Sequence, residues 1–184
     1  MVALRDMDEP PFGFQYCRYC GGKTELVADV SPHLICTSCD KSDYFNSKPC
    51  AEALVVRQRE VLLVKRTIEP YHGYWDIPGG FLELTEHPKI GAIREVSEEV
   101  GIDINIHCLL GVFLDQYDSG EMIYTLTHSY LAEPVGQPRP LSEVDAVGFF
   151  SQEVLPDKIA FSHAREVIDM AFKTYDELNR LEDR

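Results

Sequence analysis

The 184-residue chain is strongly acidic, with 31 acidic and 17 basic side chains and a formal net charge of −14. This balance argues against nucleic acid as a main partner, because phosphate binding needs clustered Lys and Arg. The first residues contain no apolar run long enough for a signal peptide, and no stretch could span a membrane, so we expect a cytoplasmic protein. A chain of this length can hold one core and a small appended module.

The N-terminal quarter of the chain is poor in large aliphatic side chains. Residues 1–13 are polar and contain proline, which predicts a flexible arm. Residues 14–46 hold two CxxC pairs, separated by 15 residues and formed by Cys17, Cys20, Cys36 and Cys39. Two such pairs suit a tetrahedral four-thiolate zinc site, and in a cytoplasmic chain they favour metal over disulfides. We therefore predict a small structural zinc ribbon over residues 14–46.

This predicted ribbon is a poor candidate for binding nucleic acid. Residues 14–46 carry three basic and four acidic side chains, and four thiolates around one Zn²⁺ would add further negative charge. We interpret the ribbon as a scaffold or dimer element.

From residue 47 onward the pattern changes to alternating strands and helices. The runs "CAEALVVR" (50–57) and "EVLLVKR" (60–66) predict a strand pair joined by two residues, and the Pro- and Gly-rich stretch 67–80 predicts a loop. Apolar residues recur at helical spacing from Pro88 to Val100. Further strands are expected near 104–115, 122–132 and 146–150, followed by a closing helix that Ser162 caps. This order favours an α/β or α+β sandwich over residues 47–184.

Three glutamates of the predicted helix share one face. Glu95, Glu98 and Glu99 stand at spacings i, i+3 and i+4, where like charges repel by roughly 0.2–0.5 kcal/mol per exposed pair. Gly101 is a natural end for the helix, so the negative charge also gathers at the helix end that disfavours anions. Hard cations such as Mg²⁺ prefer oxygen ligands and share them with substrate phosphates. The spacing is therefore that of a cation site, although charge runs are more often solvated faces.

The stretch "GFLELTEHPKIGAIREVSEEVGI" (80–102) resembles the Nudix box at every defining position. The resemblance to the Nudix hydrolase superfamily implies an α/β/α sandwich with a mixed sheet. It also implies hydrolysis of a nucleoside diphosphate linked to another moiety, with Mg²⁺ or Mn²⁺ as catalytic cofactor.

The resemblance also implies roles for individual residues. Glu95 and Glu99 are the expected main metal ligands, and the backbone of Gly79 and Gly80 is expected to help bind the cofactor, Gly79 through its carbonyl. Glu98 is either a further ligand or the general base, and the spacing does not decide between these roles.

Two further residues of the box are expected to support this site. Arg94 is expected to orient a neighbouring glutamate through a bidentate contact, although a plain structural salt bridge is an equal alternative. Glu86 is expected to join the metal cluster. Thr85 stands where many members of the superfamily have glycine, so the loop before Glu86 is expected to bend differently.

Ribbon and box together resemble the zinc-containing Nudix proteins related to plant FAD and ADP-ribose pyrophosphatases. The resemblance rests on "YCRYCGG", "ICTSCDKSDYFNSKP", "RTIEPYHGYWDIPGGFLEL" and "IAFSH". It implies that FAD or ADP-ribose is cleaved with release of AMP. The stretch "GVFLDQYDSG" lacks the motif of NADH pyrophosphatases, which stay the alternative enzyme. Non-catalytic nucleotide-sensing modules and enzymes that remove oxidised nucleotides are further alternatives.

The expected partner is thus a small nucleotide and not a membrane. Aromatic side chains near the box could stack on an adenine or flavin ring, although each alone is more often a packing residue; they are Tyr71, Tyr74, Phe81, Phe113 and Tyr117. The superfamily resemblance allows a homodimer, but no sequence feature establishes one.

Overall fold

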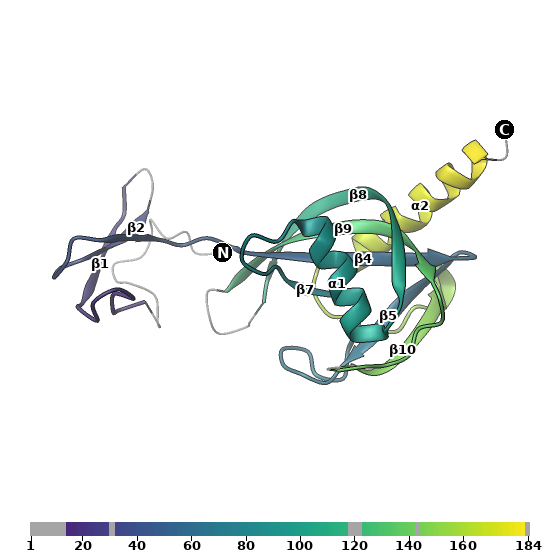
Figure 1. Cartoon of the computed structure of the whole chain (residues 1–184), viewed down its shortest axis with the longest axis horizontal. Coiled ribbons are helices and arrows are strands. Elements are labelled where there is room, and N and C mark those ends of the chain that lie inside the picture. Colours follow the sequence, from purple (N-terminus) through teal and green to yellow (C-terminus); the bar gives the residue numbers. More distant parts are fainter. Residues whose placement is uncertain (1–13, 30–31, 118–122, 143, 183–184) are drawn as a thin grey trace. The chain divides into compact units, whose positions relative to one another are not determined.

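The computed structural model describes residues 14–29, 32–117, 123–142 and 144–182 (Figure 1). It divides the chain into two compact units, one with the described residues up to Ser47 and the other starting at Lys48. The arm expected over residues 1–13 lies outside the described residues. None of the helices in the described part of the chain is long and apolar enough to cross a membrane.

The first unit contains a small antiparallel sheet. Its strands lie in the order β1-β2-β3, and their bounds are Thr24–Val27, His33–Cys36 and Ser42–Tyr44. Among its described residues, the buried apolar side chains are Leu34 and two cysteines, Cys17 and Cys36. So few buried aliphatic groups cannot offset the conformational entropy lost when this segment folds.

The second unit is a mixed sheet with a helix on each face. The five main strands lie in the order β10-β5-β4-β9-β8, and two short strands, β6 and β7, pair with β5 and β4. The bounds are β4 Lys48–Arg57, β5 Glu60–Arg66, β6 Trp75–Asp76, β7 Gly79–Phe81, α1 Pro88–Val100, β8 Asp103–Gln116, β9 Tyr124–Val135, β10 Val144–Ser151 and α2 Ala164–Glu182. A 3₁₀ turn, η2 (Gln152–Val154), follows β10. The central strands β4 and β9 are parallel, whereas the other pairs are antiparallel.

The central strand β4 divides its side chains between two cores. Ala51, Ala53 and Val55 pack in the cluster under α1, and Leu54 and Val56 pack in the cluster under α2. All five are completely buried, which explains why β4 reads as a nearly continuous apolar run in place of an alternating one. The expected α/β/α sandwich is confirmed, with α1 in front of the sheet in Figure 1.

Most elements lie close to the predicted positions. The hairpin between β4 and β5 turns at Gln58 and Arg59, both with positive φ (48° and 61°), as a two-residue hairpin of the favoured hand requires. Helix α1 begins at Pro88 and ends before Gly101, which takes the left-handed conformation (φ 68°). The closing helix begins at Ala164, later than predicted, because the Ser162 hydroxyl does not cap it but donates to Asp115.

The loop that leads into α1 contains a strained residue. Thr85 has a φ of 71°, a conformation that glycine adopts freely and that β-branched residues rarely do. The turn is closed on both sides of it, since the Glu86 amide donates to the Glu83 carbonyl (3.1 Å) and the Glu83 amide donates to Glu86 Oε2 (3.0 Å). Thr85 is therefore held in the backbone conformation that a glycine would favour.

The strain at Thr85 predicts that Thr85→Gly stabilises the protein. Relief of the strained φ outweighs the entropy that glycine adds to the unfolded chain, so we expect the free energy of unfolding to rise by about 1 kcal/mol. The melting temperature should then rise by about 2–4 °C in a calorimetric scan. Thr174→Gly in the interior of α2 is the control and should lower it, because glycine weakens helices. A similar fall in both variants would show that Thr85 is not strained.

Candidate active site

Helix α1 carries its charged residues on the side away from the core. Gly91, Ala92, Val96 and Val100 are buried under the sheet, and the glutamates predicted to bind metal lie between these positions. Their side chains are exposed to very different degrees: 15% for Glu95 and 56% for Glu98. One helix thus presents its carboxylates to different environments.

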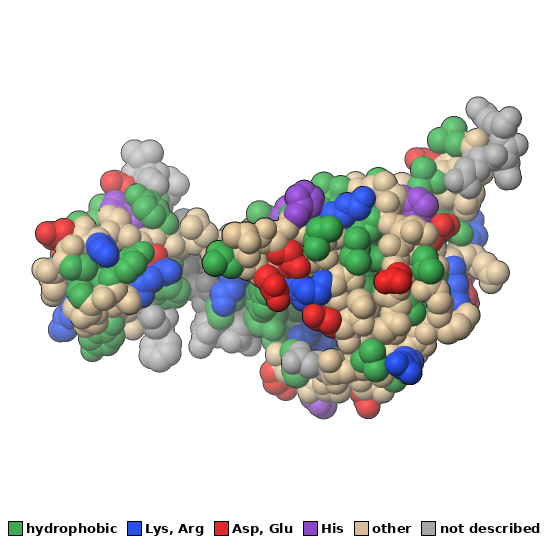
Figure 2. Space-filling view, in the orientation of Figure 1, with side chains coloured by type: hydrophobic (Ala, Val, Ile, Leu, Met, Phe, Trp, Pro, Cys, Tyr) green, Lys and Arg blue, Asp and Glu red, His purple; other side chains and the backbone are tan. Residues whose placement is uncertain are grey.

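The guanidinium of Arg94 contacts three carboxylates. Its Nε and Nη2 donate to the two oxygens of Glu86, each at 2.9 Å, in the expected bidentate geometry. Its Nη1 donates to Glu95 at 2.8 Å and to Glu98 at 2.9 Å. The hydrogen bonds from Arg94 to Glu86 hold the pKa of Glu86 far below its usual range, at about 2. Acidic and basic side chains accordingly meet at the surface beside α1 (Figure 2).

Glu99 lies on the same helix but without a guanidinium partner among the described residues. Its Oε2 accepts a hydrogen bond from the amide of Gly79 at 3.2 Å. Burial, followed by the neighbouring carboxyl groups of Asp76 and Glu95, raises the pKa of Glu99 to about 9. The expected contribution of Gly79 was through its carbonyl, whereas the contact in this structure comes from its N–H. Glu99 is therefore a largely desolvated carboxyl group, and the charge of Arg66 offsets the cost of its ionisation only in part.

Gly79 and Gly80 bring the backbone close to these carboxylates. A Cβ atom at Gly80 would lie 2.7 Å from Oε1 of Glu95, and one at Gly79 would lie 2.5 Å from Cβ of Glu52. Both approaches are shorter than real side chains allow, so a residue with a side chain would displace β7 or the glutamates. The glycines are thus needed for close packing at this site.

A cavity of about 270 Å³ opens between β4, β9 and the loops around them. Of the predicted site residues, Glu95, Glu99, Gly79 and Gly80 line it, whereas Glu86, Arg94 and Glu98 lie outside its lining. Four acidic and two basic side chains face this cavity: Glu52, Asp76, Glu95, Glu99, Arg66 and His163. The excess of two acidic groups in a partly buried space fits a divalent cation, for which Glu95 and Glu99 are suitable oxygen ligands.

Arg66 is the guanidinium that reaches into this cavity. Its Nη1 donates to Asp76 at 2.6 Å and its Nε donates to the Pro70 carbonyl at 2.9 Å. Asp76 is deeply buried, and burial raises its pKa to about 6 despite the charge of Arg66. Arg66 is thereby held in place with part of its donor capacity left for a ligand.

Aromatic rings form the mouth of the cavity. Phe81, Tyr117 and Phe161 line it, and the rings of Tyr117 and Phe161 are nearly parallel at a centroid distance of 6.0 Å. Tyr71 contacts Phe161 edge-on at 5.1 Å without lining the cavity. Two other aromatics considered from the sequence lie elsewhere: Tyr74 packs on Tyr71, and Phe113 joins the core under α2.

Sequence reasoning missed several residues of this cavity. Glu52 is a lone charge in an apolar strand, which is a usable signal because such residues are rarely buried without a role. Arg66, Asp76 and Phe161 carry no such signal, since the backbone around them reads as an ordinary strand end or loop. His163 is an isolated histidine in the sequence, and such a residue is more often structural than functional.

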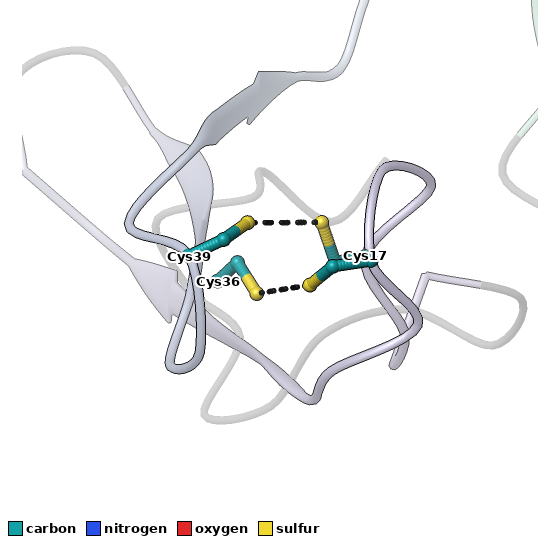
Figure 3. Close-up of side chains that lie close together, drawn as sticks. Cys17, Cys36 and Cys39 are labelled. Carbon is teal, nitrogen blue, oxygen red and sulfur yellow. Dashed lines mark hydrogen bonds between the residues drawn. The ribbon is translucent and has the colours of Figure 1, made fainter.

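The four cysteines of the first unit form a compact cluster (Figure 3). Their sulfur atoms lie within 4.8 Å of one another, with 3.8 Å between Cys17 and Cys39 and 3.5 Å between Cys20 and Cys36. These distances are too long for disulfides. They are close to the separation of about 3.8 Å that a tetrahedral metal with bonds of about 2.3 Å to sulfur imposes. Three backbone amides point at the sulfurs of Cys17, Cys20 and Cys36, each at 3.4 Å, as suits thiolate ligands.

The two candidate metal sites differ in how closely their ligand atoms are already gathered. Within the described residues, the cysteines are the one group of three or more such side chains whose ligand atoms all lie within 4.8 Å of one another. The glutamates of α1 have separate partners: Arg94 binds Glu95 and Glu98, and the Gly79 amide binds Glu99. The cysteine cluster therefore fits a closed structural site, and the glutamate site an open one.

This chain is similar to several known proteins. The chain is 26% identical over 127 residues to the ADP-ribose pyrophosphatase of Methanocaldococcus jannaschii, covering 68% of this chain and 74% of that protein. It is 28% identical to the NAD-capped RNA hydrolase NudC of Haemophilus influenzae, covering 84% of this chain but only 64% of that relative's length. The crystal structure of a NUDIX hydrolase from Nitrosomonas europaea superposes with a TM-score of 0.75 at 27% identity, covering 89% of this chain and 93% of the other.

The family match covers the five main strands of the second unit, all of α1 and the first part of α2. Residues 48–170 match the NUDIX domain, which is about two thirds of the chain and includes the glutamates of α1 and the glycines of β7. The chain therefore belongs to the NUDIX family.

Proposed function

We propose that this protein hydrolyses the pyrophosphate bond of ADP-ribose or FAD, with release of AMP and with Mg²⁺ or Mn²⁺ as cofactor. The observation that carries the proposal is the cavity in which Glu95 and Glu99 face Arg66 across a space large enough for part of a nucleotide. The reaction class agrees with the similarity to the ADP-ribose pyrophosphatase of Methanocaldococcus jannaschii, at 26% identity.

The residues of the site can take different roles in binding metal and substrate. Glu95 and Glu99 would hold the divalent cation, which when bound neutralises phosphate charge and lowers the pKa of attacking water. Arg66 would donate to a phosphoryl oxygen, and Arg94 keeps Glu95 in place. Glu98 is in reach of Arg94 and more than half exposed. Its role as further ligand or general base stays open, and either role requires it to turn from Arg94 toward the cavity.

A dinucleotide that contains nicotinamide is the second candidate substrate. The similarity to NudC covers 84% of this chain and favours it. The stretch after the box lacks the motif of NADH pyrophosphatases, which disfavours this candidate. The net charge of −14 disfavours a substrate that carries RNA. A sensing module is a weaker alternative because all three box glutamates are present.

We further propose that the cysteine cluster holds a structural Zn²⁺. Four thiolates complete a tetrahedral shell and leave no open position for a substrate. Since the first unit buries few aliphatic groups, its folding would depend on the metal.

Product analysis tests the proposed reaction directly. Purified protein with Mg²⁺ should convert ADP-ribose to AMP and ribose 5-phosphate, or FAD to AMP and FMN, as resolved by chromatography under limiting turnover. Faster cleavage of NADH to AMP and reduced nicotinamide mononucleotide would favour the second candidate. No cleavage of any of these compounds with Mg²⁺ or Mn²⁺ would contradict the proposed reaction.

The metal assignment predicts that Glu99→Gln lowers turnover by at least about 100-fold, since a ligand is lost. The fold should persist, because a neutral amide replaces a carboxyl group that is unfavourable to ionise in this buried position. Mg²⁺ should raise the melting temperature of the wild type but not of this variant. Glu177→Gln on the exposed side of α2 serves as control and should behave as the wild type. Full activity of Glu99→Gln would refute the assignment.

The zinc assignment predicts that Cys17→Ser reduces bound zinc, measured by elemental analysis, and destabilises the first unit. Three thiolates bind the ion more weakly than four, and the unit has little core to replace it. Cys108→Ser, outside the cluster, should retain full zinc content. Unchanged zinc content and melting in Cys17→Ser would count against the ribbon.

A further inference from the structure

A second polar cluster forms the wall of the cavity on the side of α2. It joins Glu52 of β4, Asp115 of β8 and His163, which directly precedes α2. His163 Nε2 lies 3.0 Å from Oε1 of Glu52, and its Nδ1 contacts Asp115. All three residues are more than 90% buried. Such a buried charge network is costly unless each member is paired, so its position beside the cavity calls for a functional explanation.

The histidine is fixed as a double donor. Burial alone would lower its pKa, but the hydrogen bonds to Asp115 and Glu52 outweigh burial and raise the pKa of His163 to about 10. Both ring nitrogens therefore carry a proton at neutral pH, and each donates to a carboxylate. Asp115 is held in turn by the hydroxyl and the amide of Ser162, at 2.5 and 3.0 Å. His163 has no free donor left for a substrate.

Glu52 uses only one of its two oxygens within the protein. Oε1 accepts from the Ser129 hydroxyl at 2.5 Å and from His163. Among the described residues, Oε2 has no hydrogen-bond donor, although the side chain is only 7% exposed and lines the cavity. This oxygen is therefore available to accept a hydrogen bond from a ligand group that enters the cavity.

The position of Glu52 limits what that ligand group can be. A phosphate is excluded because it would meet a fixed negative charge. A cation shared with α1 is also disfavoured, since Glu52 already pairs with His163, whereas Glu99 has no such ion pair among the described residues. A neutral N–H or O–H donor remains, as found on the ribose hydroxyls or the exocyclic amine of a nucleoside.

We propose that Glu52 accepts a hydrogen bond from a neutral donor of the substrate's nucleoside, and that His163 is a positioning residue that aims Glu52 at it. This inference rests on the proposed function, whose phosphates would lie at the α1 side of the same cavity. The nearby Phe161 ring supports this placement. It lines the cavity in a strained conformation, with a φ of 60°, two residues before His163.

Equilibrium binding separates this inference from turnover. Calorimetry with Mg²⁺ would compare AMP with 2′,3′-dideoxy-AMP, which lacks both hydroxyls, and with IMP, which lacks the amine. We expect the wild type to bind AMP roughly 10- to 100-fold more tightly than one of these analogues, because a hydrogen bond to a charged acceptor is lost. The weaker analogue identifies the donor. Equal affinity for all three, or no binding of AMP, would overturn the inference even where the protein cleaves its substrate.

Glu52→Gln should abolish this discrimination while it keeps the internal hydrogen bonds, since an amide oxygen can still accept from Ser129 and His163. AMP and the weaker analogue should then bind within about twofold of each other. Glu166→Gln, an exposed residue on α2, is the matched control and should discriminate as the wild type does. A variant of Glu52 that still discriminates fully would contradict the role of Glu52.

The positioning role predicts an intermediate result for His163→Gln. The glutamine amide can donate to Glu52 but not to Asp115 at the same time, so the affinity ratio between AMP and the weaker analogue should fall only in part. In the double variant with Glu52→Gln, the ratio should equal that of Glu52→Gln alone. A general loss of stability would weaken binding of all three nucleotides equally, and that outcome would reject a positioning role.

Discussion

The contact of Arg94 with three carboxylates is the interaction on which the α1 side of the site depends. Glu95 and Glu98 of α1 and Glu86 of the preceding loop would repel one another, and the guanidinium offsets that repulsion with four hydrogen bonds. The same bonds keep Glu95 next to Gly80, where only a glycine leaves room for its carboxylate. The fold can therefore carry this charge density before any cation is present.

Glu99 is on the same helix but does not bind Arg94. It sits one residue beyond Glu98, yet it turns inward to the amide of Gly79 and receives no guanidinium among the described residues. Its buried position disfavours ionisation, so a divalent cation would stabilise the carboxylate more here than at the exposed Glu98. Arg94 holds its partner carboxylates in place, whereas Glu99 is the carboxylate that a bound cation would stabilise more.

Local sequence predicted the parts of this site that lie on one helix, and tertiary structure decided the rest. The spacing of Glu95, Glu98 and Glu99 shows a shared face because an α-helix has a fixed period. Glu52 and His163 are 111 residues apart. Their contact depends on the order of the strands and on the path of the chain before α2, neither of which a local pattern encodes. Ser162 illustrates the same limit, since its hydroxyl binds Asp115 in preference to capping the helix.

The fold itself was more predictable than the cavity, for a related reason. Continuous apolar strands and an amphipathic helix indicate a sheet covered on both faces, and the cores under α1 and α2 have that composition. The short strands β6 and β7 were expected as loop because Trp75–Asp76 and Gly79–Phe81 lack strand-like patterns. β4 and β5 pair with each other only next to their hairpin, and further along they pair with β7 and β6 instead.

The ligands of the two candidate metal sites are arranged differently, and this difference supports the roles proposed for them. The cysteine sulfurs are already gathered, receive backbone N–H bonds and would fill all four positions of a tetrahedral ion. Such an ion exchanges slowly and cannot reach a substrate. The glutamates are spread along a helix and only some of them face the cavity, so they would leave coordination positions open to phosphate oxygens. A catalytic ion needs those open positions, and a structural ion is more stable without them.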